Sequence, residues 1–236
     1  MKNLIYIGLI FSGLFFSGCS SVDEIIKDTV EDTIDNDLPE DVKDSIDSDK
    51  SGLTQEVKDA ISYMYNEEAL AHDVYLNIYK IQKVNQLTNI ATNSESKHID
   101  AVNKLAIKYD LNMTQYPDTD IPYSISGIND GKFAVEHVQE LYDLLYDKGI
   151  QSKKDALEVG CIVEVVDIDD LDKYIDYAQK SNAPDVLNVF TYLRNGSYNH
   201  YWSFDKGLKN MGITEGCCSM DDVLGYKMCH PEYPKK

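Results

Sequence analysis

The chain has 236 residues, of which 43% are hydrophobic, and it carries a formal net charge of -19 from 41 acidic and 22 basic residues. This length supports one domain with a hydrophobic core and little more than a tail beside it. The acidic balance excludes nucleic acid as a partner, because phosphate binding needs clustered Lys and Arg, and it favours the attraction of cations.

The first residues have the form of an export signal. An apolar run from Leu4 to Phe16 is shorter than a membrane-spanning helix and is typical of a signal peptide. The run ends in FFSGCSS, which resembles a bacterial lipobox with Phe16 where Leu is more usual. The resemblance implies cleavage after residues 1–18 and lipidation of Cys19; an ordinary cleaved signal peptide is the alternative. We therefore expect an extracytoplasmic lipoprotein, anchored to a membrane of the cell envelope.

An acidic segment follows the lipidation site. Residues 19–52 are rich in Asp and Ser and contain few large apolar side chains. Such a segment cannot bury enough apolar surface to offset the conformational entropy that folding removes. We predict that it forms a flexible tether between the lipid and the folded domain.

The apolar residues of the next segment recur at intervals of three and four, which is the period of an amphipathic helix. The pattern predicts four long helices, over 54–81, 87–109, 152–180 and 184–210. A loop with several Pro and Gly residues follows the second helix, and a short helix over 133–148 lies on that connection. We therefore predict an all-α domain over 53–210, built as a four-helix bundle with a long crossover that carries the short extra helix.

Four cysteines remain beyond the lipidation site. Cys161 lies in an apolar helical run, and we expect a buried free thiol. The other three lie in a C-terminal tail over 211–236, and they are Cys217, Cys218 and Cys229. Export to an oxidising compartment favours a disulfide between Cys229 and one of the other two. A zinc site that includes His230 is the alternative, although its spacing fits no common zinc-finger pattern.

Five carboxylate or imidazole side chains lie on the apolar stripes of the predicted helices. One or two fall on each long helix, and they are Glu68, then Glu95 with His98, then Glu164, and finally His200. Three carboxylates and two imidazoles that face one core are hard to satisfy without a cation. Carboxylate oxygens with imidazole nitrogens suit iron, manganese or zinc. The five residues therefore predict a centre for one or two metal ions.

Neighbouring residues compete with some of these five. Glu67 is the alternative to Glu68, which the helical spacing favours, and Glu158 is the alternative to Glu164. His200 on its own is more typical of a satisfied core histidine, and only the residues on the other helices make it a candidate ligand.

Two further side chains lie close to Glu68 in the sequence. His72, one turn away, either supports the ligands or is exposed. Tyr75 is either a packed core residue, a hydrogen-bond donor or a redox relay.

The order of these motifs resembles a known family. EALAHDVY, with Glu68 and Tyr75, resembles the first-helix signature of ferritins and bacterioferritins, and ESKH resembles their second-helix Glu-x-x-His. Together with DALEVGCIVEVVDIDDL and RNGSYNH, these segments resemble a prokaryotic ferritin-like domain family of unknown function over about residues 57–208. The resemblance implies a ferritin-like bundle with a dinuclear centre held by the five residues above. Iron is the expected metal, with manganese or zinc as alternatives.

The chain departs from the ferritin-like pattern on its fourth helix. Ser197 stands three residues before His200, where the pattern has a Glu. The candidates to replace that carboxylate are Asp167, Glu67, Glu158 or water. An asymmetric or mononuclear site therefore stays open.

The sequence predicts a lipid-anchored metal protein. If it is an enzyme, oxidation of Fe(II) by dioxygen or peroxide is the expected class, as in di-iron oxidoreductases. The replaced carboxylate favours the alternative of metal binding without turnover, and an envelope interaction module is the third hypothesis. We expect a monomer or dimer rather than a storage cage, because an N-terminal tether fits no closed shell.

Overall fold

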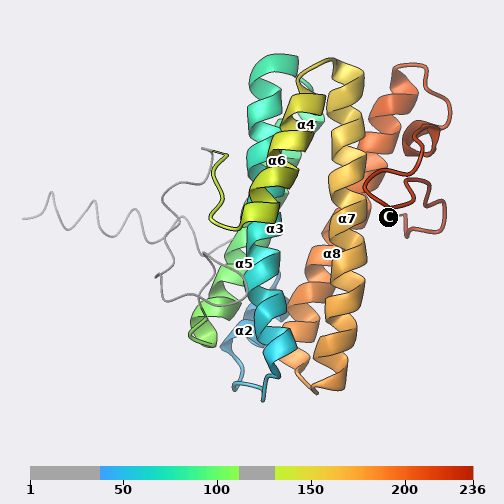
Figure 1. Ribbon diagram of the computed structural model, residues 1–236. Coiled ribbons are helices and arrows are strands. Elements are labelled where there is room, and N and C mark those ends of the chain that lie inside the picture. The colour runs from blue at the N-terminus through green and yellow to red at the C-terminus, as the bar shows by residue number, and fades with distance from the viewer. Residues whose placement is uncertain (1–37, 112–130, 236) are drawn as a thin grey trace, which may run out of the picture. The chain divides into compact units, whose positions relative to one another are not determined.

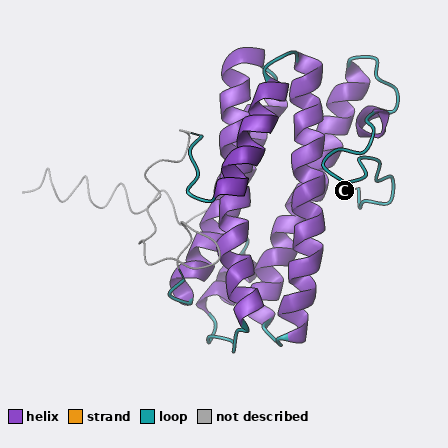
Figure 2. Ribbon diagram, in the orientation of Figure 1, coloured by secondary structure: helices purple, strands orange, loops and turns teal. Residues whose placement is uncertain are grey.

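The computed structural model describes residues 38–111 and 131–235. The predicted signal peptide, Cys19 and the first part of the predicted tether lie outside the described residues, as does most of the loop after the second predicted helix. Within the described ranges the chain is helical, and its β-type pairing is limited to an isolated bridge between Val223 and Tyr226 (Figure 2). The all-α prediction is therefore confirmed for this part of the chain.

Most of the helices follow one another with short connections, and the long connection joins α5 to α6. In chain order they are α2 (Glu40–Asp47), α3 (Gln55–Gln82), α4 (Asn85–Ile90), the π-helix η1 (Ala91–Glu95), α5 (Ser96–Lys108), α6 (Glu136–Gly149), α7 (Lys153–Lys180), α8 (Pro184–Asn210) and the 3-10 helix η2 (Gly216–Ser219). The bounds of α3, α6, α7 and α8 agree closely with the predicted helices. Ser152 begins α7 by accepting a hydrogen bond from the backbone N–H of Asp155, and Pro184 begins α8.

The second predicted helix differs from the structure. Instead of one regular helix over 87–109, α4 leads into the π-helix η1, and α5 follows it. The side chains of Thr92 and Asn93 donate to the carbonyl oxygens one turn earlier, those of Thr88 and Asn89. Side-chain bonds of this kind compete with the regular backbone ladder and favour local irregularity.

The folded part also begins earlier than predicted. Residues 38–52, assigned to the tether, contain helix α2, whose Val42 is buried. The side-chain amide of Asn188 on α8 donates to the carbonyl of Asp41 and to the hydroxyl of Ser45, at 2.9 and 2.7 Å. The end of the predicted tether is therefore a helix packed on α8. Its composition is polar because only one side of it is buried.

The long helices α3, α5, α7 and α8 run side by side, and α6 lies along α3 and α7 (Figure 1). Neighbours surround the middle of α3, where every residue from Met64 to Tyr75 is buried. Two hydrophobic clusters fill the interior. One contains the C-terminal half of α3, the N-terminal half of α7 and the C-terminal half of α8, and the other contains the opposite halves.

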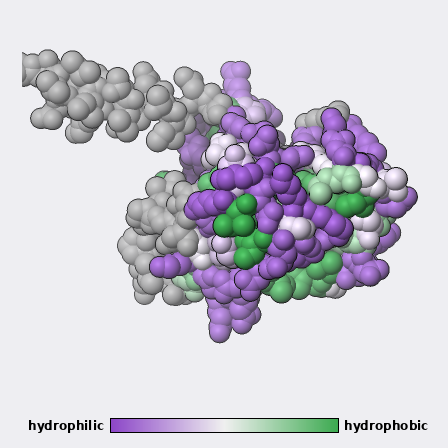
Figure 3. All heavy atoms as spheres, turned by 90° about the horizontal axis from the view of Figure 1, so that it is seen from above, coloured by the Kyte–Doolittle hydropathy of each residue, from purple (hydrophilic) through white to green (hydrophobic). Residues whose placement is uncertain are grey.

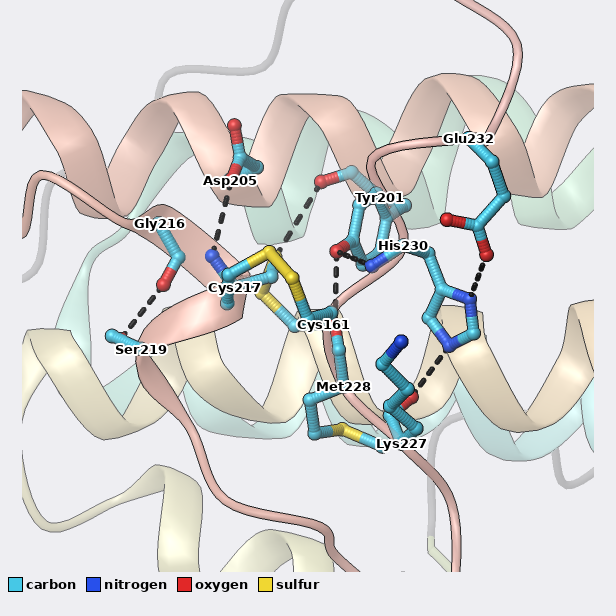
Figure 4. Close-up of a disulfide and its surroundings, with 12 residues drawn as sticks. Cys161, Tyr201, Asp205, Gly216, Cys217, Ser219, Lys227, Met228, His230 and Glu232 are labelled. Atoms are coloured by element: carbon cyan, nitrogen blue, oxygen red, sulfur yellow. Dashed lines mark hydrogen bonds and ion pairs between the residues drawn. A yellow bond between two sulfur atoms is a disulfide. The ribbon is translucent and has the colours of Figure 1, made fainter.

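One disulfide attaches the C-terminal segment to α7, where Cys161 is bonded to Cys217 (Figure 4). A second disulfide, between Cys218 and Cys229, closes a loop within the segment. The prediction of a free thiol at Cys161 is therefore wrong, although the residue is buried as expected. Helical periodicity locates a cysteine on a buried face but not the partner that reaches it from another segment. The predicted pairing of Cys229 with one of the two adjacent cysteines agrees with the structure.

Figure 3 shows the molecule of Figure 1 from above, and on this face the surface is mostly hydrophilic with small hydrophobic patches. None of the helices in the described ranges combines the length and the apolar character needed to cross a membrane.

Candidate metal centre

The five predicted ligands lie in a polar layer between the two hydrophobic clusters. On α3 this layer is at Glu68, next to the point where the cluster membership changes between Ala69 and Leu70. On α8 it lies between Leu193 of one cluster and Tyr201 of the other. On α7, Glu164 lies shortly before the change, which falls between Val166 and Leu171. Glu95 and His98 lie between Ala91 of one cluster and Ile99 of the other. All five side chains are buried, with exposed fractions between 1% and 6%.

The first group of ligand atoms combines α3 with the second helical segment. Nδ1 of His98 lies 3.1 Å from Oε2 of Glu68 and 3.0 Å from Oε2 of Glu95. Atoms of these three residues lie within 4.8 Å of one another, which is compact enough for one metal ion.

The second group shares a residue with the first. Nδ1 of His200 lies 3.1 Å from Oε1 of Glu95 and 3.3 Å from Oε2 of Glu164. These three residues also offer ligand atoms within 4.8 Å of one another. Since each oxygen of Glu95 faces a different histidine, its carboxylate stands between the two groups. The two imidazole rings are 5.5 Å apart, centre to centre.

The π-helix η1 ends at Glu95 and places two residues of the centre. Glu95 reaches both groups, and the preceding Ser94 lies 2.7 Å from Nε2 of His200 through its hydroxyl oxygen. A π-turn inserted in an α-helix often occurs at a functional site. Sequence analysis did not identify Ser94, because its role depends on a contact with another helix.

A glycine of α8 makes room for His98. A Cβ atom at Gly196 would lie 2.4 Å from Nε2 of His98, which is far inside a normal contact distance. The imidazole therefore lies directly over the backbone of α8, with its Nδ1 toward the carboxylates. Gly196 also escaped the sequence analysis, since no pattern distinguishes it from other helical glycines.

The carboxylates and imidazoles shift one another's proton affinities. Burial alone would lower the pKa of both histidines, but the neighbouring carboxylates outweigh it, and the pKa of His200 rises to about 10. The pKa of His98 rises well above its usual value for the same reason. Burial raises the pKa of Glu68 to about 7, although His98 opposes the rise. Burial also acts on Glu95, but the two histidines together hold its pKa below the ordinary range.

Several atoms of the centre have no hydrogen-bond partner. One is the buried Oε1 of Glu68. The other two are Oε1 of Glu95 and Nδ1 of His200, which lie 3.1 Å apart as an ion pair but without the geometry of a hydrogen bond. Leaving such an atom unpaired costs about 1–3 kcal/mol, and more when the group is charged. Carboxylate oxygens and imidazole nitrogens without hydrogen bonds, directed at one another, are the donor set that a transition-metal ion requires. The residues present therefore fit a metal ion.

Tyr75 and Phe204 complete the wall of the centre on the side of the first hydrophobic cluster. The hydroxyl of Tyr75 donates to Oε1 of Glu164 at 2.6 Å, and the ring packs on Phe204 at 5.3 Å. Tyr75 is thus both a packed core residue and a hydrogen-bond donor. It leaves Oε2 of Glu164 to face His200.

Ser197 does not leave a gap where the ferritin-like pattern has a carboxylate. Its hydroxyl donates to Oδ2 of Asp167 at 2.5 Å and to the carbonyl of Leu193 at 3.1 Å. Asp167 therefore lies next to the position in question, supplied by α7 rather than α8. It is not part of either compact ligand group.

The remaining predicted residues lie outside the two groups. Glu158 pairs with Lys148 at 2.7 Å and also with Lys154, so it is a structural ion pair. His72 is buried rather than exposed, and its Nδ1 lies 3.1 Å from Oδ1 of Asp73. Glu67, the alternative to Glu68, is also buried, and it lines a separate pocket.

The whole centre lies within the residues that match a known protein family. Residues 57–220 match the family described as "Uncharacterized protein domain (DUF2202)". "Uncharacterized protein MJ0754" of Methanocaldococcus jannaschii is 37% identical over 163 residues, which cover 69% of this chain and 80% of that protein. The crystal structure of hypothetical protein MJ0754 from Methanococcus jannaschii is similar, with a TM-score of 0.61 over 70% of this chain and 86% of that one. All five candidate ligands lie within the matched residues.

Proposed function

We propose that this chain, which belongs to the DUF2202 family, binds two iron ions in a ferritin-like helical bundle and oxidises Fe(II). One observation carries the proposal: two buried Glu–Glu–His groups from different helices share the carboxylate of Glu95. A carboxylate whose two oxygens face different histidines is suited to bridge two ions. Such an iron pair, when bound, supplies the redox chemistry by which dioxygen or peroxide accepts electrons from Fe(II).

The protein residues in this proposal have separate tasks. Glu68 and His98 hold one ion, and Glu164 and His200 hold the other, with Glu95 between them. Tyr75 keeps one oxygen of Glu164 in place by donating to it. The hydrophobic clusters on both sides exclude water from the layer, which strengthens the electrostatic attraction for a cation. Both histidines must give up a proton when a cation binds, so metal affinity should rise with pH.

The shared carboxylate gives the proposal a sharp test. Iron, manganese and zinc are to be counted in the purified protein after anaerobic loading. We expect two ions per chain in the wild type. Glu95→Gln keeps the size of the side chain but removes its charge, and it should abolish both sites. Glu68→Gln and Glu164→Gln should each lose one ion, because each of those residues belongs to one group only.

A buried carboxylate outside the centre provides the matched control. Glu158→Gln removes an equally buried charge from α7 but leaves both ligand groups intact, so two ions should remain. If the wild type retains no more than traces of metal after loading with iron, with manganese and with zinc, the metal centre is refuted. If Glu68→Gln loses both ions, the sharing of Glu95 between two separate ions is refuted.

Turnover is tested separately from binding. Oxygen or peroxide consumption on addition of Fe(II) should be faster with the wild type than in buffer, and Glu95→Gln should return it to the buffer rate. If iron binds but Fe(II) oxidation is no faster than in buffer, the function is metal holding without turnover. The hydrogen bond from Ser197 to Asp167 favours this second function, because it engages the carboxylate nearest to the missing ligand position.

We also propose that Cys19 carries a lipid that anchors the protein in the cell envelope. The FFSGCSS sequence supports lipidation. The two disulfides support an oxidising compartment, because such bonds rarely persist in the cytosol. Mass spectrometry of the N-terminal peptide should find a diacylated Cys19, and Cys19→Ser should release the protein from membranes. A wild-type peptide without lipid would refute the anchor.

A further inference from the structure

A series of carboxylates leads from the candidate metal centre along α7. Glu164, Asp167 and Asp170 follow one another at intervals of three, so each lies about one turn from the next and is its neighbour on the helix surface. Their exposure increases along the series: Glu164 is 2% exposed, Asp167 is 8% exposed, and the side chain of Asp170 is 16% exposed. The series therefore runs from the buried centre toward solvent.

Glu67 of α3 faces this series across a narrow pocket. Its side chain is hydrogen-bonded to that of Asp170. Glu67 and Asp167 are the two acidic residues among those that line the pocket. The other lining residues are apolar and come from α3, α6 and α7, and they are Leu70, Leu141, Leu145, Ile162, Val163 and Val166. The pocket volume of about 20 Å³ holds a species no larger than a water molecule or a small ion.

The pocket contains a buried acceptor without a partner. Oε2 of Glu67 makes no hydrogen bond, and Glu67 is 93% buried. Two carboxyl groups bond to each other only when one of them holds a proton, and Oε2 of Glu67 still has no donor among the apolar side chains that line the pocket. Such a site is unfavourable for an anion and favourable for a small cation. On the solvent side, Lys173 lies 4.0 Å from Asp170, and half of its side chain is exposed, so it opposes a cation only weakly.

The inner end of the pocket adjoins the metal centre. The hydroxyl of Ser197 holds Oδ2 of Asp167 at 2.5 Å. Glu67 directly precedes the ligand Glu68 on α3, and Asp167 lies one turn beyond the ligand Glu164 on α7. A cation bound between Glu67 and Asp167 would therefore be close to both groups.

We propose that Glu67, Asp167 and Asp170 form a transit site through which divalent metal ions reach the centre. The inference rests on the proposed function, since a transit site needs a centre to fill. Asp170 attracts the ion at the surface, Glu67 takes it into the pocket, and Asp167 passes it to Glu68 or Glu164. Each step exchanges one carboxylate oxygen for another, the proton that Glu67 and Asp170 share is released to solvent when the ion enters, and no electron is transferred.

The rate of metal uptake tests this site. Co(II) is mixed anaerobically with the full protein in a stopped-flow instrument, and its visible absorbance bands report arrival at the centre. Glu67→Gln keeps the size of the side chain and its ability to donate to Asp170 but removes the carboxyl group that becomes a charged ligand when a cation displaces its proton. We expect uptake to slow about tenfold, the lower end of the range for electrostatic guidance of charged ligands. The final number of ions and their spectrum should equal those of the wild type.

A second variant and a control make the result decisive. Asp170→Asn lies nearer to solvent and should slow uptake in the same way. Glu140→Gln removes an exposed charge from α6, outside the pocket, and should load at the wild-type rate. If Glu67→Gln and Asp170→Asn both load at the wild-type rate, or if Glu67→Gln binds fewer ions, the transit site is overturned while the centre stands. If the wild type takes up no Co(II), both the centre and the transit site are overturned.

Discussion

Ser94 determines how the imidazole of His200 is presented to the carboxylates. Its hydroxyl lies 2.7 Å from Nε2, while Nδ1 of the same ring faces Glu95 and Glu164. A hydrogen bond to the second ring nitrogen fixes the tautomer and orientation of a metal-binding histidine. Ser94 therefore acts on a proposed ligand without contacting the ion.

Replacing Ser94 by Ala should weaken metal binding without unfolding the protein. The loss of such an orienting contact typically costs 10–100-fold in metal affinity, by rough estimate. Competition with a chelator of known affinity measures the effect. Ser96→Ala is the matched control, because that hydroxyl is exposed and bonds only to the carbonyl of Thr92 in the same helical segment. Equal affinities of wild type and Ser94→Ala would contradict the orienting role.

At the scale of residues, the sequence predicted those site residues that can be recognised from their position on one face of a single helix. Glu68, Glu95 and Glu164 are recognisable because each is charged and lies among apolar residues at the helical period, and all three are buried together. Ser94 and Gly196 were missed because their importance arises only where two helices meet. Tertiary contacts of this kind leave no periodic signal in a single sequence.

At the scale of elements, helix ends with a local cause were predictable. Pro184 begins α8 and a serine caps α7, and both act within their own turn. The π-helix η1 was not predictable, because one extra residue per turn changes the apolar spacing too little within five residues. Helix α2 was missed for another reason: its burial depends on contacts with α8 that lie more than a hundred residues away.

The two disulfides should contribute unequally to stability. Cys161 and Cys217 are 56 residues apart, whereas Cys218 and Cys229 are 11 apart. In the chain-entropy description, the longer loop restricts the unfolded chain more, by about 1.4 kcal/mol. Replacing Cys161 and Cys217 together by Ala should therefore lower the free energy of unfolding by more than replacing the other pair. Guanidinium unfolding without reductant measures both differences.

A reducing buffer provides the control for this comparison. When both disulfides are reduced, no cross-link restricts the unfolded chain. The part of the difference in free energy of unfolding between the wild type and each double variant that comes from the cross-link should then disappear. Equal losses for the two pairs, or a larger loss for the pair Cys218 and Cys229, would contradict the expected order.

At the scale of the whole molecule, the polar layer divides the core. The hydrophobic clusters on either side each contain residues from several helices, so each has its own source of stability. This arrangement lets five buried carboxylate and imidazole groups exist at mid-length without unfolding the bundle. The sequence predicted the five residues because each interrupts the apolar stripe of a predicted long helix, whereas their alignment in one layer comes from the packing of the helices.

At the end of the bundle where α8 begins, one carboxylate, that of Asp185, holds three segments of the chain together. It lies at the start of α8 and accepts from the hydroxyl of Ser51 at 2.7 Å, from Tyr109, and from Lys108 at 2.7 Å. Ser51 lies between α2 and α3, while Lys108 and Tyr109 are at the end of α5. Lys108 and Asp185 are both buried, so this is a desolvated ion pair. Burial alone would raise the pKa of Asp185, but these hydrogen bonds outweigh it and lower the pKa.

Asp185→Asn should destabilise the protein at neutral pH and much less in acid. A pKa that is lower in the folded than in the unfolded state contributes stability above the unfolded value of about 3.9, and this contribution is lost as pH falls through the folded pKa. Removing one partner of a buried ion pair costs roughly 3–5 kcal/mol, because Lys108 stays buried without its counter-charge. Urea unfolding at pH 7 should show this loss. Asp176→Asn, in an exposed pair with Lys180, should change stability by less than about 1 kcal/mol. A loss for Asp185→Asn that stays constant down to pH 3 would show that Asp185 stabilises the fold by some means other than its charge.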